Sequence, residues 1–155
     1  MKSGPTSLIL KSETDTAAFA GKVARTLTAG DVILLEGPIG AGKSAFARAV
    51  IRFLAGADIE VPSPTFTLVQ TYPFSDFDVW HCDLYRLSHP DEAIELGVDA
   101  AFEEAVCLVE WPDRLGDLLP ENALTLAFAA TETHHTVSFH PSKFWAEKLS
   151  LQENV

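Results

Sequence analysis

The chain has 155 residues, of which 47% are hydrophobic, enough apolar material for the core of a single domain spanning residues 1–155. It carries 22 acidic and 11 basic residues, and the resulting net charge of −11 argues against strong direct binding to nucleic acid. No apolar segment approaches transmembrane length and both cysteines, Cys82 and Cys107, stand in apolar runs, so we expect a cytoplasmic protein with buried thiols and no membrane contact.

The N-terminal part predicts a strand followed by a helix. The strand is expected at residues 7–10. Ser12 or Thr14 can cap the helix that follows, and Gly30 is expected to end it. Its apolar stripe is formed by Phe19, Val23 and Leu27.

Residues 37–44 read GPIGAGKS and match the pattern G-x-x-x-x-G-K-S/T at every fixed position. The flanks agree, because DVILLEG before it is typical of a buried parallel strand and residues 44–54 after it have apolar residues at helical spacing. Glycines let consecutive N–H groups turn toward a phosphate, and the helix N-terminus adds partial positive charge. A chance glycine-rich turn is the alternative that these flanks disfavour.

We therefore predict a nucleoside triphosphate site. Lys43 would bridge the β- and γ-phosphates, and the hydroxyl of Ser44 would be a Mg²⁺ ligand. The other loop residues expected to contact the nucleotide are Ile39, Gly40, Ala41, Gly42 and Ala45.

After the motif, prolines exclude helix and predict an extended segment at residues 62–64. Residues 65–71 and 77–83 then read as two strands of an antiparallel hairpin. The remaining elements expected are a short helix closed by Gly97, a buried strand from Ala105 to Trp111, a helical turn at 113–115, two antiparallel strands within 122–140, and a C-terminal helix with Phe144 and Leu149 inward. The fold class is therefore α/β: a P-loop NTPase-like three-layer fold with a mostly parallel central sheet and an antiparallel hairpin insertion.

Two carboxylates stand at the ends of predicted strands, Asp83 after DVWHC and Glu110 after AVCLV. A P-loop hydrolase needs a carboxylate on a neighbouring strand to hold Mg²⁺ or its waters. Glu110 follows the longer apolar run, so we assign Glu110 with Ser44 to the metal, and Asp83 to metal-bound water or to the nucleophile. For each carboxylate the alternative is a charged strand end that faces solvent.

Several other polar and aromatic residues remain ambiguous. Thr65, in the proline-flanked SPTF, is a candidate for contact with the γ-phosphate or Mg²⁺, and an ordinary turn residue is the simpler interpretation. Trp111 either packs or covers the site. His81 is expected to be a structural histidine with satisfied hydrogen bonds, and His134 and His135 are expected to be solvated.

Cations are scarce, since only Arg86 and Arg114 occur between Arg52 and Lys143. Small-molecule kinases close an arginine-bearing lid over the transferred phosphate, and this chain has no segment of that kind. An arginine finger is worth roughly 10³–10⁵ in rate, so we expect slow hydrolysis that depends on another protein. The absence of an N-K-x-D motif favours ATP over GTP. A small-molecule kinase and a non-hydrolysing, nucleotide-dependent interaction module are the alternatives.

The motifs GPIGAGKS, SPTFTLVQTY, HCDLYRL and LVEWPDRL resemble, in order and spacing, the bacterial TsaE (YjeE) family of small ATPases in tRNA threonylcarbamoyladenosine biosynthesis. The resemblance covers roughly Glu13 to Leu119. It implies ATP and Mg²⁺ as cofactors, a P-loop fold with an antiparallel insertion, and a partnership with the TsaD–TsaB complex. It also implies that tRNA is contacted only indirectly, through those partners.

The same resemblance assigns roles by position. Lys43 and Ser44 match the family's phosphate and Mg²⁺ contacts, and Glu110 matches its Mg²⁺ carboxylate. Asp83 matches a carboxylate that the family needs for hydrolysis, and Thr65 matches its switch-like threonine. Trp111 matches the family's tryptophan at the site, and Glu13 with Thr14 matches the segment that holds the nucleotide base. Many members have threonine in place of Ser44, and both hydroxyls can bind Mg²⁺.

Overall fold

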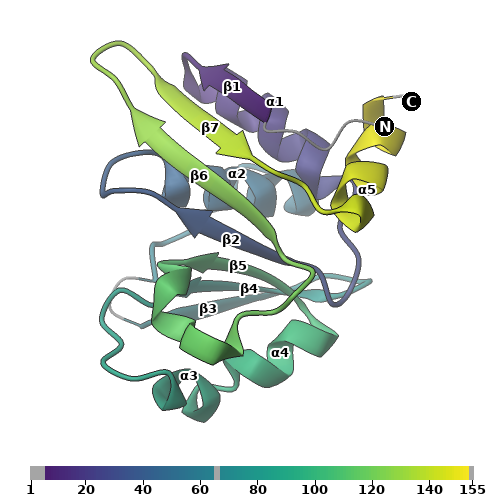
Figure 1. Cartoon of the computed structure of the whole chain (residues 1–155). Coiled ribbons are helices and arrows are strands. Elements are labelled where there is room, and N and C mark those ends of the chain that lie inside the picture. Colours follow the sequence, from purple (N-terminus) through teal and green to yellow (C-terminus); the bar gives the residue numbers. More distant parts are fainter. Residues whose placement is uncertain (1–5, 65–66, 154–155) are drawn as a thin grey trace.

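The computed structural model describes residues 6–64 and 67–153, so Thr65 lies outside the described residues. Its seven strands form one sheet in the order β1-β7-β6-β2-β5-β4-β3 (Figure 1). The four inner strands run parallel, and they are β6 (Leu124–Ala130), β2 (Val32–Glu36), β5 (Val106–Glu110) and β4 (Asp78–Asp83). The outer strands pair antiparallel, and they are β1 (Thr6–Leu10), β7 (His135–Phe139) and β3 (Val69–Pro73). The parallel centre and the antiparallel β3–β4 hairpin are as predicted.

Helices cover both faces of the sheet and make the three layers (Figure 1). One face carries α1 (Glu13–Ala24), α2 (Lys43–Ala55) and α5 (Lys143–Glu153). The other carries α3 (Asp91–Glu95), α4 (Val98–Glu104) and the 3₁₀ segment η1 (Pro112–Leu118). None of the helices in the described ranges is long and apolar enough to cross a membrane.

The central strands are apolar throughout because both of their faces are buried. In β2, Ile33 and Leu35 pack in the core under α1 and α2, whereas Val32 and Leu34 pack in the core against α4. This alternation is the two-residue period of a strand, and burial on both faces is typical of parallel sheets. It also places Cys82 and Cys107 as buried free thiols, as predicted.

Two predicted boundaries are wrong because side chains and local turns interrupt the pattern. Helix α1 ends at Ala24 rather than Gly30, since the chain then turns and the hydroxyl of Thr26 donates to the carbonyl of Val23. Strand β3 begins at Val69, because the chain turns at the preceding residues 67–68, which were predicted to be in the strand: Leu68 has a φ of 69° and its N–H donates to the carbonyl of Pro64. The predicted start at 65 lies outside the described residues.

The inward face of α5 also differs from the prediction. Phe144 is 45% exposed, whereas the neighbouring Trp145 is fully buried and donates its indole N–H to the carbonyl of Asn122 at 2.7 Å. The ammonium of Lys148 bonds to the buried carboxylate of Asp31 and holds the helix in this rotation. Leu149 packs against the same core, as expected.

Candidate functional site

The glycine-rich motif forms the turn between β2 and α2. Helix α2 begins at Lys43, and its N-cap is Gly42, which has no side chain to accept a hydrogen bond. No acidic residue stands in the first turn of the helix. The first N–H groups of α2 therefore remain available to an anion, and the helix dipole favours negative charge at the same point.

A cavity of about 500 Å³ lies at this end of α2 and gathers most of the predicted site. The predicted residues on its wall are Ile39, Gly40, Gly42, Lys43, Ser44, Ala45, Asp83, Glu110 and Trp111. Ala41 belongs to the same loop, but its side chain is buried in the core beneath α2. Only the backbone of Ala41 can therefore face a ligand.

The two carboxylates meet because their strands are parallel neighbours. In the register of β4 and β5, Asp83 lies opposite Glu110, and both side chains are buried at the same edge of the sheet. Strand β5 also pairs with β2, so the prediction that Glu110 ends a central neighbour of the motif strand is confirmed. The hydroxyl Oγ of Ser44 lies 3.1 and 2.9 Å from Oε1 and Oε2 of Glu110.

The donor atoms of Ser44 and Glu110 fit magnesium. Mg²⁺ prefers hydroxyl and carboxylate oxygens, and it is typically bound by one or two protein groups while phosphates and water complete the octahedron. Within the described ranges no group of three or more His, Cys, Asp or Glu side chains is arranged to hold a metal by itself. The pair is therefore suited to a metal that arrives with a phosphate ligand.

Lys43 is buried next to both carboxylates. Its ammonium donates to the carbonyl oxygens of Gly37 and Pro38 and lies 4.2 Å from the centre of the Trp111 ring. Burial lowers the pKa of Lys43 from its ordinary 10.5, and the charges of Glu110 and Asp83 oppose that shift. The cation is thus within electrostatic reach of both acidic groups.

Trp111 both packs and faces the cavity. It follows Glu110 directly and has a φ of 59°, a left-handed conformation that costs a non-glycine residue about 1–2 kcal/mol. Its ring contacts the ring of Tyr85, with centroids 4.9 Å apart, and packs partly against the core under α4. The strained turn aims the indole at Lys43.

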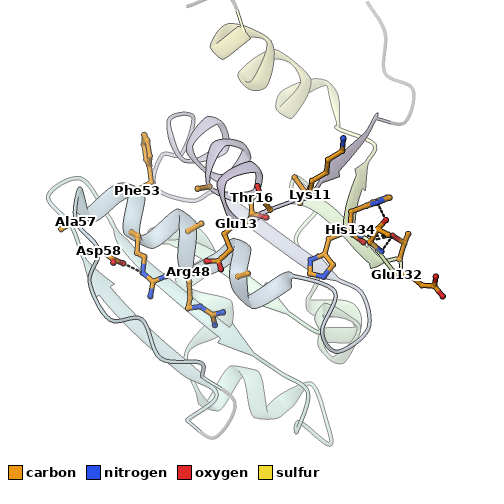
Figure 2. A pocket seen from close by; sticks show the side chains of 18 residues that line it. Lys11, Glu13, Thr16, Arg48, Phe53, Ala57, Asp58, Glu132 and His134 are labelled. Atoms are coloured by element: carbon orange, nitrogen blue, oxygen red, sulfur yellow. Dashed lines mark hydrogen bonds and ion pairs between the residues drawn. The ribbon is translucent and has the colours of Figure 1, made fainter.

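A second, larger cavity of about 840 Å³ adjoins the first and shares Ala45, Arg48 and His135 with it. Figure 2 shows the side chains around it, which come from the start of α1, from α2 and from the β6–β7 turn. Glu13, predicted near the base, is on its wall. Thr14, predicted with it, is exposed and is not among the lining residues.

Five residues of the smaller cavity were not predicted as site residues: Pro38, Arg48, Tyr85, Arg86 and His135. Arg48 stands four residues after Ser44 on α2, so helical spacing was a usable signal. His135 was expected to be solvated and was not assigned to the site. It is half-buried on the wall of both cavities, and its Nδ1 would lie 3.2 Å from a Cβ placed on Gly42.

Comparison with known proteins identifies the family. The sequence profile described as "Threonylcarbamoyl adenosine biosynthesis protein TsaE" matches residues 10–137. The chain belongs to the TsaE family. The tRNA threonylcarbamoyladenosine biosynthesis protein TsaE of Rickettsia bellii is 43% identical over 112 residues, 72% of this chain and 78% of that protein. The TsaE protein of that name from Bacillus subtilis is 33% identical over 147 residues, 91% of each chain.

A solved structure shows the same fold. The crystal structure of Bacillus subtilis YdiB superposes with a TM-score of 0.80 at 25% identity, covering 99% of this chain and 97% of that one. Both the predicted family and the predicted fold class are confirmed.

Proposed function

We propose that this TsaE-family protein is a Mg²⁺-dependent ATPase that acts with the TsaD–TsaB complex in tRNA threonylcarbamoyladenosine biosynthesis. The observation that carries the proposal is the convergence of Lys43, Ser44, Asp83 and Glu110 on one cavity at the N-terminus of α2. Free backbone N–H groups, a buried ammonium and a hydroxyl–carboxylate pair are the groups that a metal–triphosphate requires. The names of the relatives supply the pathway.

The two adjoining cavities divide the nucleotide between them. The triphosphate occupies the smaller one, where Lys43 neutralises the β- and γ-phosphates, and the nucleoside occupies the larger one, where Glu13 lies on the wall. Arg48 lines both cavities and stands at the boundary, so it is placed to meet a phosphate oxygen or the ribose.

The two carboxylates have different tasks. Ser44 and Glu110 hold Mg²⁺, which when bound supplies charge neutralisation to the phosphate oxygens. Asp83, opposite Glu110 on β4, orients the attacking water by accepting a hydrogen bond from it. Thr65 stays a predicted contact of the γ-phosphate or the metal.

Apolar surface beside the cavity supports a dependence on the partner complex. Ile39, at the tip of the loop, is 80% exposed, and Tyr85 is exposed on the same wall. A protein that covers these side chains would bury them and exclude water from the phosphates, which strengthens every charge interaction there. Hydrolysis is therefore slow in the free protein and faster with TsaD–TsaB.

Phosphate release and ATP binding, measured with and without the TsaD–TsaB complex, test the proposal. Asp83→Ala should bind ATP and fail to hydrolyse it, whereas the control Asp99→Ala, on α4 at the opposite face, should behave as wild type. Wild-type turnover by Asp83→Ala would refute the role of this carboxylate. Binding without release in either condition would favour the interaction module, and phosphate transfer to a metabolite would favour a kinase.

A further inference from the structure

A fully buried histidine lies directly beneath the metal-site carboxylate. His81 is on β4, and its Nε2 lies 2.8 Å from Oε2 of Glu110. The parallel register sets His81 opposite Leu108 and Asp83 opposite Glu110. Because residues two apart share a face of a strand, the imidazole lies one step deeper in the sheet than the two carboxylates, on the same face.

The surroundings of the ring indicate where its hydrogen is. Nδ1 of His81 is buried and has no hydrogen-bond partner within the described part of the chain. A hydrogen on Nδ1 would be an unsatisfied buried donor, at a cost of about 1–3 kcal/mol. The hydrogen therefore belongs on Nε2, and His81 donates it to Glu110.

Glu110 is consequently held by donors from two different elements. The hydroxyl of Ser44, on α2, lies 2.9 Å from Oε2, and Nε2 of His81, on β4, meets the same oxygen from below. A glutamate side chain has three rotatable bonds, so a single hydrogen bond would leave its carboxylate free to turn. Two donors from fixed elements define the direction of the oxygens.

We propose that His81 is a positioning residue whose Nε2–H orients the Glu110 carboxylate toward the metal. The proposal rests on the Mg²⁺–ATP site proposed above. A purely structural role explains the histidine less well, because the core beside it is apolar, with Val79 and Leu108 buried nearby on the same face. A leucine at position 81 would fill that space without a desolvated ring nitrogen. What the imidazole adds is the hydrogen bond from Nε2 to Glu110.

The test separates metal affinity from nucleotide affinity in three variants. His81→Leu removes the donor, His81→Gln keeps an amide N–H near the position of Nε2, and His81→Asn keeps an amide that is too short to reach Glu110. The dissociation constant of Mn²⁺, used as the probe, is measured by electron paramagnetic resonance in the ternary complex with ADP. The affinity for ADP alone is measured in EDTA, and thermal unfolding reports whether each variant is folded.

We expect His81→Leu to weaken Mn²⁺ binding about 10–100-fold, the effect typical of removing a group that orients a metal ligand. ADP affinity in EDTA should stay at the wild-type value, and His81→Gln should restore most of the Mn²⁺ affinity. If His81→Leu does not fold, the Mn²⁺ affinities of His81→Gln and His81→Asn provide the same comparison between a variant with the donor and one without it. Wild-type Mn²⁺ affinity without a donor at position 81, or an equal loss in the glutamine variant, would overturn the proposal. Failure of the wild-type protein itself to bind Mn²⁺ with ADP would instead overturn the proposed function.

Discussion

Gly37, the first glycine of the motif, is the position where the loop comes closest to the sheet. A Cβ placed on Gly37 would lie 2.3 Å from the carbonyl oxygen of Phe128 in β6, and the residue has a φ of 136°. Gly40, in the same loop, has a φ of 84° and nothing within 4 Å of its Cβ position. Gly37→Ala and Gly40→Ala can therefore be compared, because both place a Cβ in the same loop and only the one at position 37 meets the backbone of β6.

The free energy of unfolding separates the two variants. Each alanine is forced to a positive φ that costs an L residue about 1–2 kcal/mol or more, and the φ of 136° at position 37 is further from the left-handed minimum than the φ of 84° at position 40. The effect of each alanine on the entropy of the unfolded chain is the same and cancels in the comparison. Gly37→Ala adds a clash with backbone that no side-chain rotation can relieve, and overpacking of this kind costs about 1–3 kcal/mol. Gly37→Ala should thus be the less stable variant by about 1–3 kcal/mol.

Urea denaturation followed by tryptophan fluorescence measures this difference, and ATP binding reports on the loop. Because relief of the clash moves the loop away from β6, Gly37→Ala should also bind ATP more weakly than the wild type. In a chain of this size each kcal/mol shifts the melting temperature by roughly 2–4 °C, so thermal unfolding is an independent check. Equal stability of the two variants would refute the close approach of Gly37 to Phe128.

Two further predictions concern the core. Trp145→Ala should lower the free energy of unfolding by about 3–5 kcal/mol, whereas Phe144→Ala should lower it by about 1 kcal/mol or less, since only Trp145 is fully buried. Urea titration measures both losses of stability, and equal losses would contradict the rotation of α5. Burial raises the pKa of Cys107 to about 12, so between pH 9 and that value the unfolded chain loses a proton that the folded chain keeps. The free energy of unfolding should therefore fall with rising pH, by about 1.4 kcal/mol per pH unit for this thiol. In denaturation curves recorded at several pH values, Cys107→Ala should lose stability less steeply with pH than the wild type. An unchanged dependence of stability on pH in this variant would contradict the prediction.

The loop and both carboxylates could be predicted from the sequence because each depends on local rules. The motif has a fixed spacing, and a polar residue at the end of an apolar run marks the end of a buried strand. Since parallel strands end at the same edge of a sheet, Asp83 and Glu110 had to meet once β4 and β5 were adjacent. Each of these steps uses only a few neighbouring residues.

The contacts that were missed depend on long-range pairing. His135 reaches the cavity because β7 pairs with β6, and β6 in turn runs parallel to β2, a path across three strands that no local pattern encodes. The contact of His81 with Glu110 likewise needs the register of β4 against β5. In α5, Phe144 and Trp145 are adjacent aromatics, and hydrophobicity alone cannot say which faces inward. The bonds of Trp145 to Asn122 and of Lys148 to Asp31 make that choice.

The charge of the site supports the proposed metal independently of the geometry of Ser44 and Glu110. Two like charges 4 Å apart repel by about 4 kcal/mol at an effective dielectric of 20, and a triphosphate in the smaller cavity would approach two buried carboxylates. Lys43, Arg48 and Arg86 line the same cavity and oppose this repulsion only in part, because the triphosphate itself carries several negative charges. In the proposed complex, a divalent cation held by Ser44 and Glu110 would offset this repulsion. On the proposed function, the acidic wall would therefore favour the metal–nucleotide complex over the free nucleotide, and discrimination between them would depend on how firmly Glu110 is held.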